Sequence, residues 1–178
     1  MSGRTAPRPA RSSMMTAAPR PARVPTMSND QAITSAVILS IGDELTLGQI
    51  VDTNAAWLSA RLIERGILTL YRKTVPDDQP AIVATLREAA SAGGLVLISG
   101  GLGPTQDDLT RQAMAEAAGA GLVLHEPSLE HIRTFFRKIG RPMPTHNNIQ
   151  AMCPTGGEML HNSCGTAPGI HMRLGSST

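Results

Sequence analysis

A glycine-rich segment that runs into two adjacent carboxylates is the part of the sequence best suited to chemistry. Residues 100–103 read Gly-Gly-Leu-Gly, and Pro104 and Thr105 lead from them to Asp107 and Asp108. Glycine lets backbone N–H groups approach a ligand closely, and the N-terminus of a following helix favours phosphate. Because the carboxylates would repel a phosphate, we expect at least one of them to bind a divalent metal that the phosphate shares.

A second acidic loop follows an earlier apolar run. Residues 36–41 are aliphatic except for one serine, and Gly42, Asp43 and Glu44 come directly after them. Ligands of open α/β sheets bind at the carboxyl ends of the strands, so the two acidic loops would face one crevice if their strands are neighbours. Taken alone, Asp43 and Glu44 are equally typical of a solvated turn. The glycine segment is longer than a simple strand-to-helix connection needs, which favours a ligand site there.

Other well-known motifs are missing. The glycine segment matches neither the dinucleotide fingerprint nor the lysine-containing phosphate loop, so metal and backbone would have to neutralise the phosphates. A third acidic pair, Asp77 and Asp78, follows another apolar run, but Asp78 is typical of a helix N-cap. His161 and Cys164 are spaced H-x-x-C, without the second ligand pair that a zinc site requires. We expect Cys153 and Cys164 to be reduced and structural.

The elements that would hold these loops alternate regularly. The apolar patterns predict strands at residues 36–41, 67–74 and 95–98, and helices that begin at Asp52 or Thr53, at Asp78 and at Leu109. Such alternation favours a mainly parallel sheet with helices on both faces. Further on, the sequence predicts a short strand near Leu122, a helix at 128–138, a helical turn at 147–152, and a loop that enters an unpaired strand at 165–172, as in a domain shortened at its C-terminus.

Composition limits the class of protein. The 178 residues, 41% of them hydrophobic, suffice for one domain, which we place at residues 34–178. Residues 1–33 are rich in Pro, Arg and Ser, and we expect this basic tail to be disordered. Five arginines precede the first acidic residue, Asp30, and without them 14 acidic residues outnumber 11 basic ones. We therefore expect no binding to nucleic acid or membranes, and a cytoplasmic protein.

Several motifs together resemble one family. They are Gly42-Asp43-Glu44-Leu45, Asp52-Thr53-Asn54, Val75-Pro76-Asp77-Asp78, the segment from Gly100 to Thr110, Asn147 with Gln150-Ala151, and Gly165-Thr166-Ala167-Pro168-Gly169. In order and spacing they are similar to the N-terminal domain of the competence/damage-inducible CinA proteins, in the molybdopterin-binding MoaB/Mog group. The resemblance covers residues 35–171.

The resemblance implies a three-layer α/β/α fold and a pocket for a pterin phosphate or nucleotide. CinA-type domains are associated with metal-dependent hydrolysis of ADP-ribose at its pyrophosphate, so a divalent metal (Mg²⁺, Mn²⁺ or Co²⁺) is expected, with molybdopterin as a further ligand. Carried over by position, the metal and catalytic residues would be Asp43, Asp107 and Asp108. The ligand-binding residues would be Gly42, Glu44, Asn54, Gly100, Gly101, Leu102, Gly103, Pro104, Thr105, Thr110, Asn147, Gln150 and Thr166.

Two functions stay open at this point. One is a phosphohydrolase in which a metal held by Asp43 and by Asp107 or Asp108 activates water. The other is a module that binds molybdopterin or a nucleotide without turnover, or that serves a partner in cofactor assembly. A third interpretation is a truncated and largely inactive paralogue. The resemblance also implies a homo-oligomer, a dimer or trimer. Full-length relatives often continue into a nicotinamide-mononucleotide deamidase domain, and we expect this sequence to lack that activity.

Overall fold

The computed structural model describes residues 32–92, 94–175 and 177–178. The expectation of a disordered tail therefore lies almost wholly outside the described residues. No helix in the described part of the chain is long and apolar enough to cross a membrane.

A parallel three-stranded sheet is the centre of the described part. Its strands are β1 (Ser35–Ile41), β2 (Leu68–Val75) and β3 (Leu95–Ser99), in the order β2-β1-β3. Ile41 of β1 aligns with Val75 of β2, and Ser40 aligns with Ser99 of β3, so all three strands end at the same edge. The predicted strands and their parallel pairing are confirmed. β1 is the middle strand and is almost fully buried, which explains why its sequence is nearly continuously apolar.

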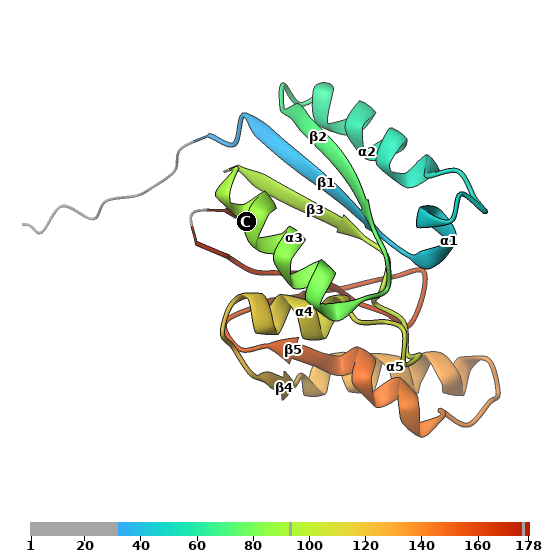
Figure 1. Cartoon of the computed structure of the whole chain (residues 1–178). Coiled ribbons are helices and arrows are strands. Elements are labelled where there is room, and N and C mark those ends of the chain that lie inside the picture. The colour runs from blue at the N-terminus through green and yellow to red at the C-terminus, as the bar shows by residue number, and fades with distance from the viewer. Residues whose placement is uncertain (1–31, 93, 176) are drawn as a thin grey trace, which may run out of the picture. The chain divides into compact units, whose positions relative to one another are not determined.

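Helices cover both faces of this sheet (Figure 1). On one face, α2 (Thr53–Ile63) packs Ala55 and Leu62 against Ala36 and Ile38. On the other, α3 (Gln79–Ser91) and α4 (Thr110–Ala117) enclose the larger core, which contains Val37, Leu39, Ile82, Leu86 and Met114. The three-layer α/β/α fold is thus confirmed.

The predicted N-caps are present at two of these helices. Asp52 accepts a hydrogen bond from the amide of Ala55 at 2.9 Å, and Asp78 accepts one from Ala81 at 2.9 Å. α4 differs, because its N-cap residue Leu109 makes no side-chain cap bond. Asp108, the residue before it, instead accepts hydrogen bonds from Gly103 and Thr105.

The chain after α4 forms a smaller layer. It contains β4 (Leu122–Leu124), α5 (Glu126–Lys138), the 3₁₀ helix η1 (Thr145–Ala151) and β5 (Met152–Pro154). β4 and β5 pair antiparallel, and Leu129, Ile132 and Ala151 form a separate core. α5 begins two residues earlier than predicted because the side chain of His125, not an oxygen-bearing residue, caps it by accepting from Ser128 N.

Three elements differ from the sequence-based expectation. Asp43 lies in a short helix, α1 (Asp43–Thr46), instead of an open loop. β5 was not predicted, because three residues carry no visible period. The strand expected to be unpaired near the end, β7 (Gly169–His171), pairs antiparallel with β6 (Glu158–Leu160).

β3 is an edge strand of the sheet. On the side away from β1, Val96 N–H donates to Thr178 O at 2.7 Å and Thr178 N–H donates to Gly94 O at 3.2 Å. These bonds form one register pair of a parallel ladder. Beside it lies an apolar cavity of about 310 Å³, whose walls include Leu86, Val96, Ile98, Met114 and Ile170.

Candidate functional site

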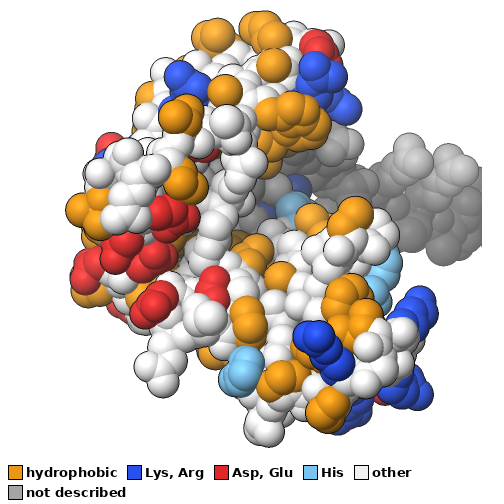
Figure 2. All heavy atoms as spheres, turned by 90° about the vertical axis from the view of Figure 1, so that its right-hand side faces the viewer, with side chains coloured by type: hydrophobic (Ala, Val, Ile, Leu, Met, Phe, Trp, Pro, Cys, Tyr) orange, Lys and Arg blue, Asp and Glu red, His pale blue; other side chains and the backbone are white. Residues whose placement is uncertain are grey.

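Carboxylates crowd the edge where the three strands end. We call Asp43, Glu44, Asp77 and Asp107 the acidic rim. Asp43 follows β1 and Asp77 follows β2, and the two are joined directly: Asp43 N–H donates to Asp77 Oδ2 at 3.0 Å, and Asp77 N–H donates to Asp43 Oδ1 at 3.1 Å. Figure 2 shows acidic side chains gathered on one side of the face that it presents.

The electrostatics of the rim are clearest at Asp77. Partial burial raises the pKa of the Asp77 carboxyl, and the negative charges of Asp43, Glu44 and Asp107 raise it further. The hydrogen bond from the amide of Asp43 acts in the opposite direction. The four carboxylates of the acidic rim therefore repel one another, and a bound cation would reduce this repulsion.

The glycine loop, residues 100–108, crosses the end of β3 at van der Waals contact with its neighbours. A Cβ on Gly100 would lie 2.0 Å from the carbonyl oxygen of Ile41, and a Cβ on Gly101 would lie 2.2 Å from Thr110 Oγ1. Both glycines also have positive φ, +104° and +64°. Glycine is therefore required here by packing as well as by backbone conformation.

The start of α4 holds three successive carbonyls of this loop. Thr110 Oγ1 donates to Gly100 O at 2.8 Å, Thr110 N–H donates to Gly101 O at 3.1 Å, and Arg111 Nη2 donates to Leu102 O at 3.0 Å. In a trans peptide the N–H of the next residue points the opposite way. The amides of Gly101 and Leu102 therefore point away from α4, and within the described residues neither donates a hydrogen bond.

Asp108 closes the other side of the loop. Its Oδ1 accepts from Gly103 N at 2.7 Å, and its Oδ2 accepts from Thr105 N at 2.8 Å and from Thr105 Oγ1 at 2.6 Å. The carboxylate thus serves the loop itself. Pro104 lies inside this ring, and Asp107 is exposed beside it.

The structure allows a test of whether a divalent metal fits. Oxygen donors of the right type are concentrated in the acidic rim. Among the described residues, however, no three acidic, histidine or cysteine side chains are arranged so that they could hold an ion together. Asp43, Asp77 and Asp107 would have to converge on the ion, whereas Asp108 would have to give up its loop hydrogen bonds.

Two further residues of the expected site lie at the same edge. Gly42 N–H donates to Val75 O at 3.0 Å and so ties the ends of β1 and β2 together. Asn54, near the start of α2, donates from Nδ2 to Ser99 Oγ at 3.2 Å and ties α2 to the end of β3. The edge therefore brings together Gly42, Asp43, Glu44, Asn54 and the glycine loop.

The remaining expected residues lie in η1 and in the loop between β6 and β7. Asn147 and Gln150 lie in η1, only 4% and 1% exposed, and Asn147 Nδ2 donates to Gln150 Oε1 at 2.8 Å. Thr166 lies between β6 and β7, next to Gly165, whose carbonyl is 3.3 Å from His131 Nε2 of α5. Within the described residues, no hydrogen bond joins these three residues to the glycine loop.

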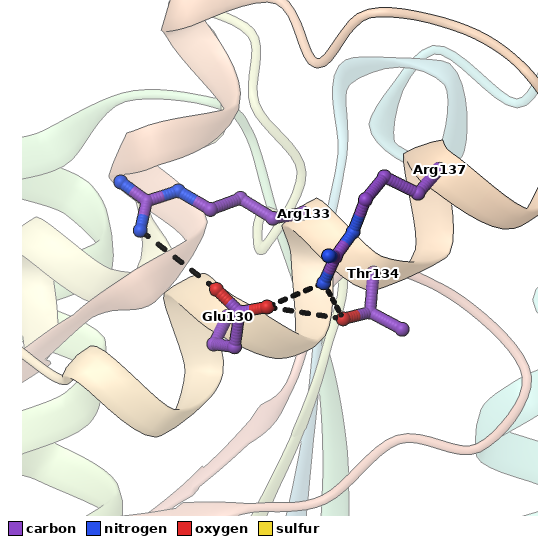
Figure 3. Close-up of polar contacts among 4 residues, drawn as sticks. All are labelled: Glu130, Arg133, Thr134 and Arg137. Carbon is purple, nitrogen blue, oxygen red and sulfur yellow. Dashed lines mark hydrogen bonds and ion pairs between the residues drawn. The ribbon is translucent and has the colours of Figure 1, made fainter.

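A second charged group occupies α5, shown in Figure 3. Glu130 pairs with Arg137 at 2.5 Å and with Arg133 at 3.9 Å, and Arg137 also donates to Thr134 Oγ1 at 2.7 Å. The side chains of Glu130, Arg133 and Arg137 are each more than half exposed. Ion pairs between exposed side chains contribute little to stability. These α5 side chains offer no free backbone amides like those of the glycine loop.

Sequence reasoning missed Asp77 and Arg111. Asp77 had the same signal as Asp43, a position directly after a strand, but its neighbour Asp78 accounted for the pair as a cap. Arg111 had no signal, because an arginine in the first turn of a helix is ordinary until its burial is known.

Comparisons with known proteins support the assignment of the fold and family. Residues 37–176 match the family model described as a probable molybdopterin binding domain. A CinA-like protein of Anaeromyxobacter sp. (strain Fw109-5) is 47% identical over 138 residues, which is 78% of this chain and 34% of that protein. A CinA-like protein of Geobacter metallireducens is 46% identical over 137 residues, 77% of this chain and 33% of that protein. The chain thus spans about a third of the length of these relatives.

Solved structures agree. The protein CinA from Thermoplasma acidophilum, described as of unknown function, superposes with a TM-score of 0.74 at 32% identity over 80% of this chain and 83% of that chain. A molybdopterin biosynthesis protein from Mycobacterium abscessus superposes with a TM-score of 0.53 at 20% identity over 82% of this chain and 78% of that chain, which is evidence for the fold alone.

Proposed function

The chain belongs to the family of probable molybdopterin binding domains, and from this premise we propose that it binds the diphosphate of a nucleotide or pterin at the glycine loop. The observation that supports the proposal is the direction of the loop peptides. Thr110 and Arg111 hold three carbonyls inward, so the amides of Gly101 and Leu102 are left as donors for an anion. The N-terminal end of α4 lies behind these peptides and adds a positive partial charge from a greater distance.

We further propose that the chain hydrolyses ADP-ribose-like pyrophosphates with Mg²⁺, Mn²⁺ or Co²⁺. Asp43 and Asp107 would hold the ion, Asp77 would lie beside it, and Asp108 would remain with the loop. The ion would supply Lewis acidity to a phosphoryl oxygen and make a nearby water more acidic.

The residues of the chain would then divide the work. The amides of Gly101 and Leu102 would bind phosphoryl oxygens and stabilise the charge that develops on them. Asp77, whose pKa is raised by burial and by its acidic neighbours, is suited to accept a proton from the attacking water at a free carboxylate oxygen. Asn54 and Ser99 would hold the wall of the pocket on the α2 side.

The direct experiment is to incubate the purified chain with ADP-ribose and each of the three metals and to measure AMP release. We expect metal-dependent release that stops when the metal is chelated, and that is reduced at least tenfold in Asp107→Asn. Arg133→Gln on α5 is a control that should behave like the wild type. No AMP with any of the three metals would overturn the hydrolase proposal.

A second function is favoured by the absence, in the described part of the chain, of any ready-made ion site. In it, the chain binds molybdopterin or a nucleotide without turning it over. Ligand at 100 times its Kd would then stabilise the fold by about 2.7 kcal/mol. A rise in Tm with ADP-ribose or a pterin phosphate, without product, would select this function.

We also propose that the chain acts in the cytoplasm on a small molecule and that it forms a homo-oligomer, a dimer or trimer. Sedimentation of the purified chain tests the oligomer, and a monomer at micromolar concentration would overturn it.

A further inference from the structure

Arg111 is the most deeply buried charged side chain in the described part of the molecule. It is 0% exposed, although it lies in the first turn of α4 beside the glycine loop. Only Nη2 has a partner, the carbonyl of Leu102 at 3.0 Å, whereas Nε and Nη1 have no hydrogen-bond partner among the described residues. A guanidinium stays protonated in proteins, so a positive charge is buried here with two unused donors.

The Asp108 carboxylate offsets this charge only in part. Burial lowers the pKa of Arg111, and the neighbouring Asp108 carboxylate acts against that effect. Among the described residues, however, Arg111 and Asp108 form no ion pair and no direct hydrogen bond: the Asp108 oxygens accept from the amides of Gly103 and Thr105 and from Thr105 Oγ1. Burying a charge without full compensation is destabilising, and packing alone does not explain why an arginine is buried at this position.

Arg111 and Asp108 hold the two ends of one peptide group. Arg111 binds the carbonyl of Leu102, and Asp108 binds the N–H of Gly103, which belongs to the same peptide. This peptide follows directly on the two whose amides, those of Gly101 and Leu102, point outward. The buried charge therefore lies behind the donors that an anion would use.

We propose that Arg111 is the internal cation of the phosphate site: a positioning residue that acts through the Leu102 peptide and favours a diphosphate over neutral ligands at the loop. This inference rests on the proposed binding function. The loop lacks a lysine, and the acidic rim on its other side repels anions. Water screens a buried charge less than an exposed one, so Arg111 can act on a phosphate at the loop through the intervening peptide. The proposed site therefore has two oppositely charged sides: phosphates would bind on the side of Arg111, and the metal would bind at the acidic rim.

Two substitutions separate the charge from the hydrogen bond. Arg111→Gln keeps a side-chain N–H donor for Leu102 but removes the charge, and Arg111→Lys keeps both a donor and the charge. Arg87→Gln is the matched control, because Arg87 also donates to a single backbone carbonyl, Glu116 O at 3.3 Å, but is exposed on α3. Tm and circular dichroism of all three show whether the fold is retained.

The measurement is titration calorimetry of the full chain with inorganic pyrophosphate and Mg²⁺, and separately with adenosine. We expect Arg111→Gln to weaken pyrophosphate binding at least tenfold, Arg111→Lys and Arg87→Gln to bind within threefold of the wild type, and adenosine binding to be the same in all. If the wild type binds no pyrophosphate, the proposed function fails.

If the wild type binds but Arg111→Gln binds equally well, or Arg111→Lys is as weak as Arg111→Gln, this inference alone is overturned. Should Arg111→Gln not fold, the ratio of pyrophosphate to adenosine affinity in Arg111→Lys decides, and a ratio reduced tenfold or more would contradict the role of the charge.

Discussion

Asp43 and Asp77 exchange hydrogen bonds: the amide of each donates to the carboxylate of the other, at 3.0 and 3.1 Å. The loops after two neighbouring strands are thereby locked together, although the pair places two negative charges side by side. The hydrogen bonds offset a repulsion that the acidic rim would otherwise feel in full.

The first prediction concerns pH. Because the pKa of Asp77 is raised in the folded chain above its ordinary value of 3.8, the folded state binds more protons than the unfolded state between the two pKa values. Stability contributed by this group therefore falls as pH rises through that window, and the loss is complete at neutral pH. Asp77→Asn, which can still accept from Asp43 N, should raise Tm at pH 7 and have no effect below about pH 3.5.

Thermal unfolding of wild type and Asp77→Asn from pH 3 to 8 measures this difference. A lower Tm of the variant at pH 7 would mean that the lost charge had been stabilising. Asp78→Asn is the control, because the asparagine still caps α3 and Asp78 lies outside the pair.

The second prediction separates the two adjacent carboxylates of the loop. Asp108→Ala removes three hydrogen bonds to a charged group and should destabilise the chain by about 1.5–3 kcal/mol. Asp107→Ala, at an exposed position, should change the free energy of unfolding by less than about 0.5 kcal/mol but weaken metal-dependent ligand binding. Urea denaturation compares the two, and equal stability losses would contradict the loop role of Asp108.

The third prediction uses two glycines with the same backbone conformation. Gly101 and Gly119 have φ of +64° and +63°. A Cβ on Gly101 would lie 2.2 Å from Thr110 Oγ1, whereas a Cβ on Gly119 would meet no neighbour within 4 Å among the described residues. Gly119→Ala should cost about 1–2 kcal/mol from conformation alone. Gly101→Ala should cost clearly more and abolish phosphate binding, since it displaces Thr110. Similar unfolding midpoints for both would show that the loop can shift at little cost.

The fourth prediction concerns the edge of the sheet. Val96 N–H points away from β1, toward Thr178, and Ile98, two residues on, faces the same way. Leu97 faces β1. In hydrogen exchange followed by NMR, the amide of Ile98 should therefore exchange much faster than that of Leu97. Equal protection would indicate a further partner at this edge.

The sequence was sufficient for the elements whose patterns are long. The apolar run of β1, the cap at Asp78 and the stripe of α3 each gave one interpretation, and alternation then implied the parallel sheet. β5 and β6 were missed because three-residue strands owe their existence to tertiary pairing. The cap of α5 was placed late because His125 is a rare capping residue.

The site was predictable in location but not in its division of tasks. Glycines and carboxylates after β1 and β3 marked the right edge of the sheet. The sequence does not show which of the two carboxylates accepts hydrogen bonds from the loop. That depends on the orientation of the Asp108 side chain, which its hydrogen bonds with Gly103 and Thr105 fix. The burial of Arg111 depends on the packing of α4 under the loop, which no local pattern encodes.

The single register pair between Thr178 and β3 has a practical consequence. Within the described residues β3 has no further partner on this side, and an unpaired strand edge beside an apolar cavity can pair with a strand of another molecule. The purified 178-residue chain should therefore become turbid as it is concentrated. Substituting a charged residue next to Ile98 should oppose this pairing and raise the concentration at which the protein stays in solution.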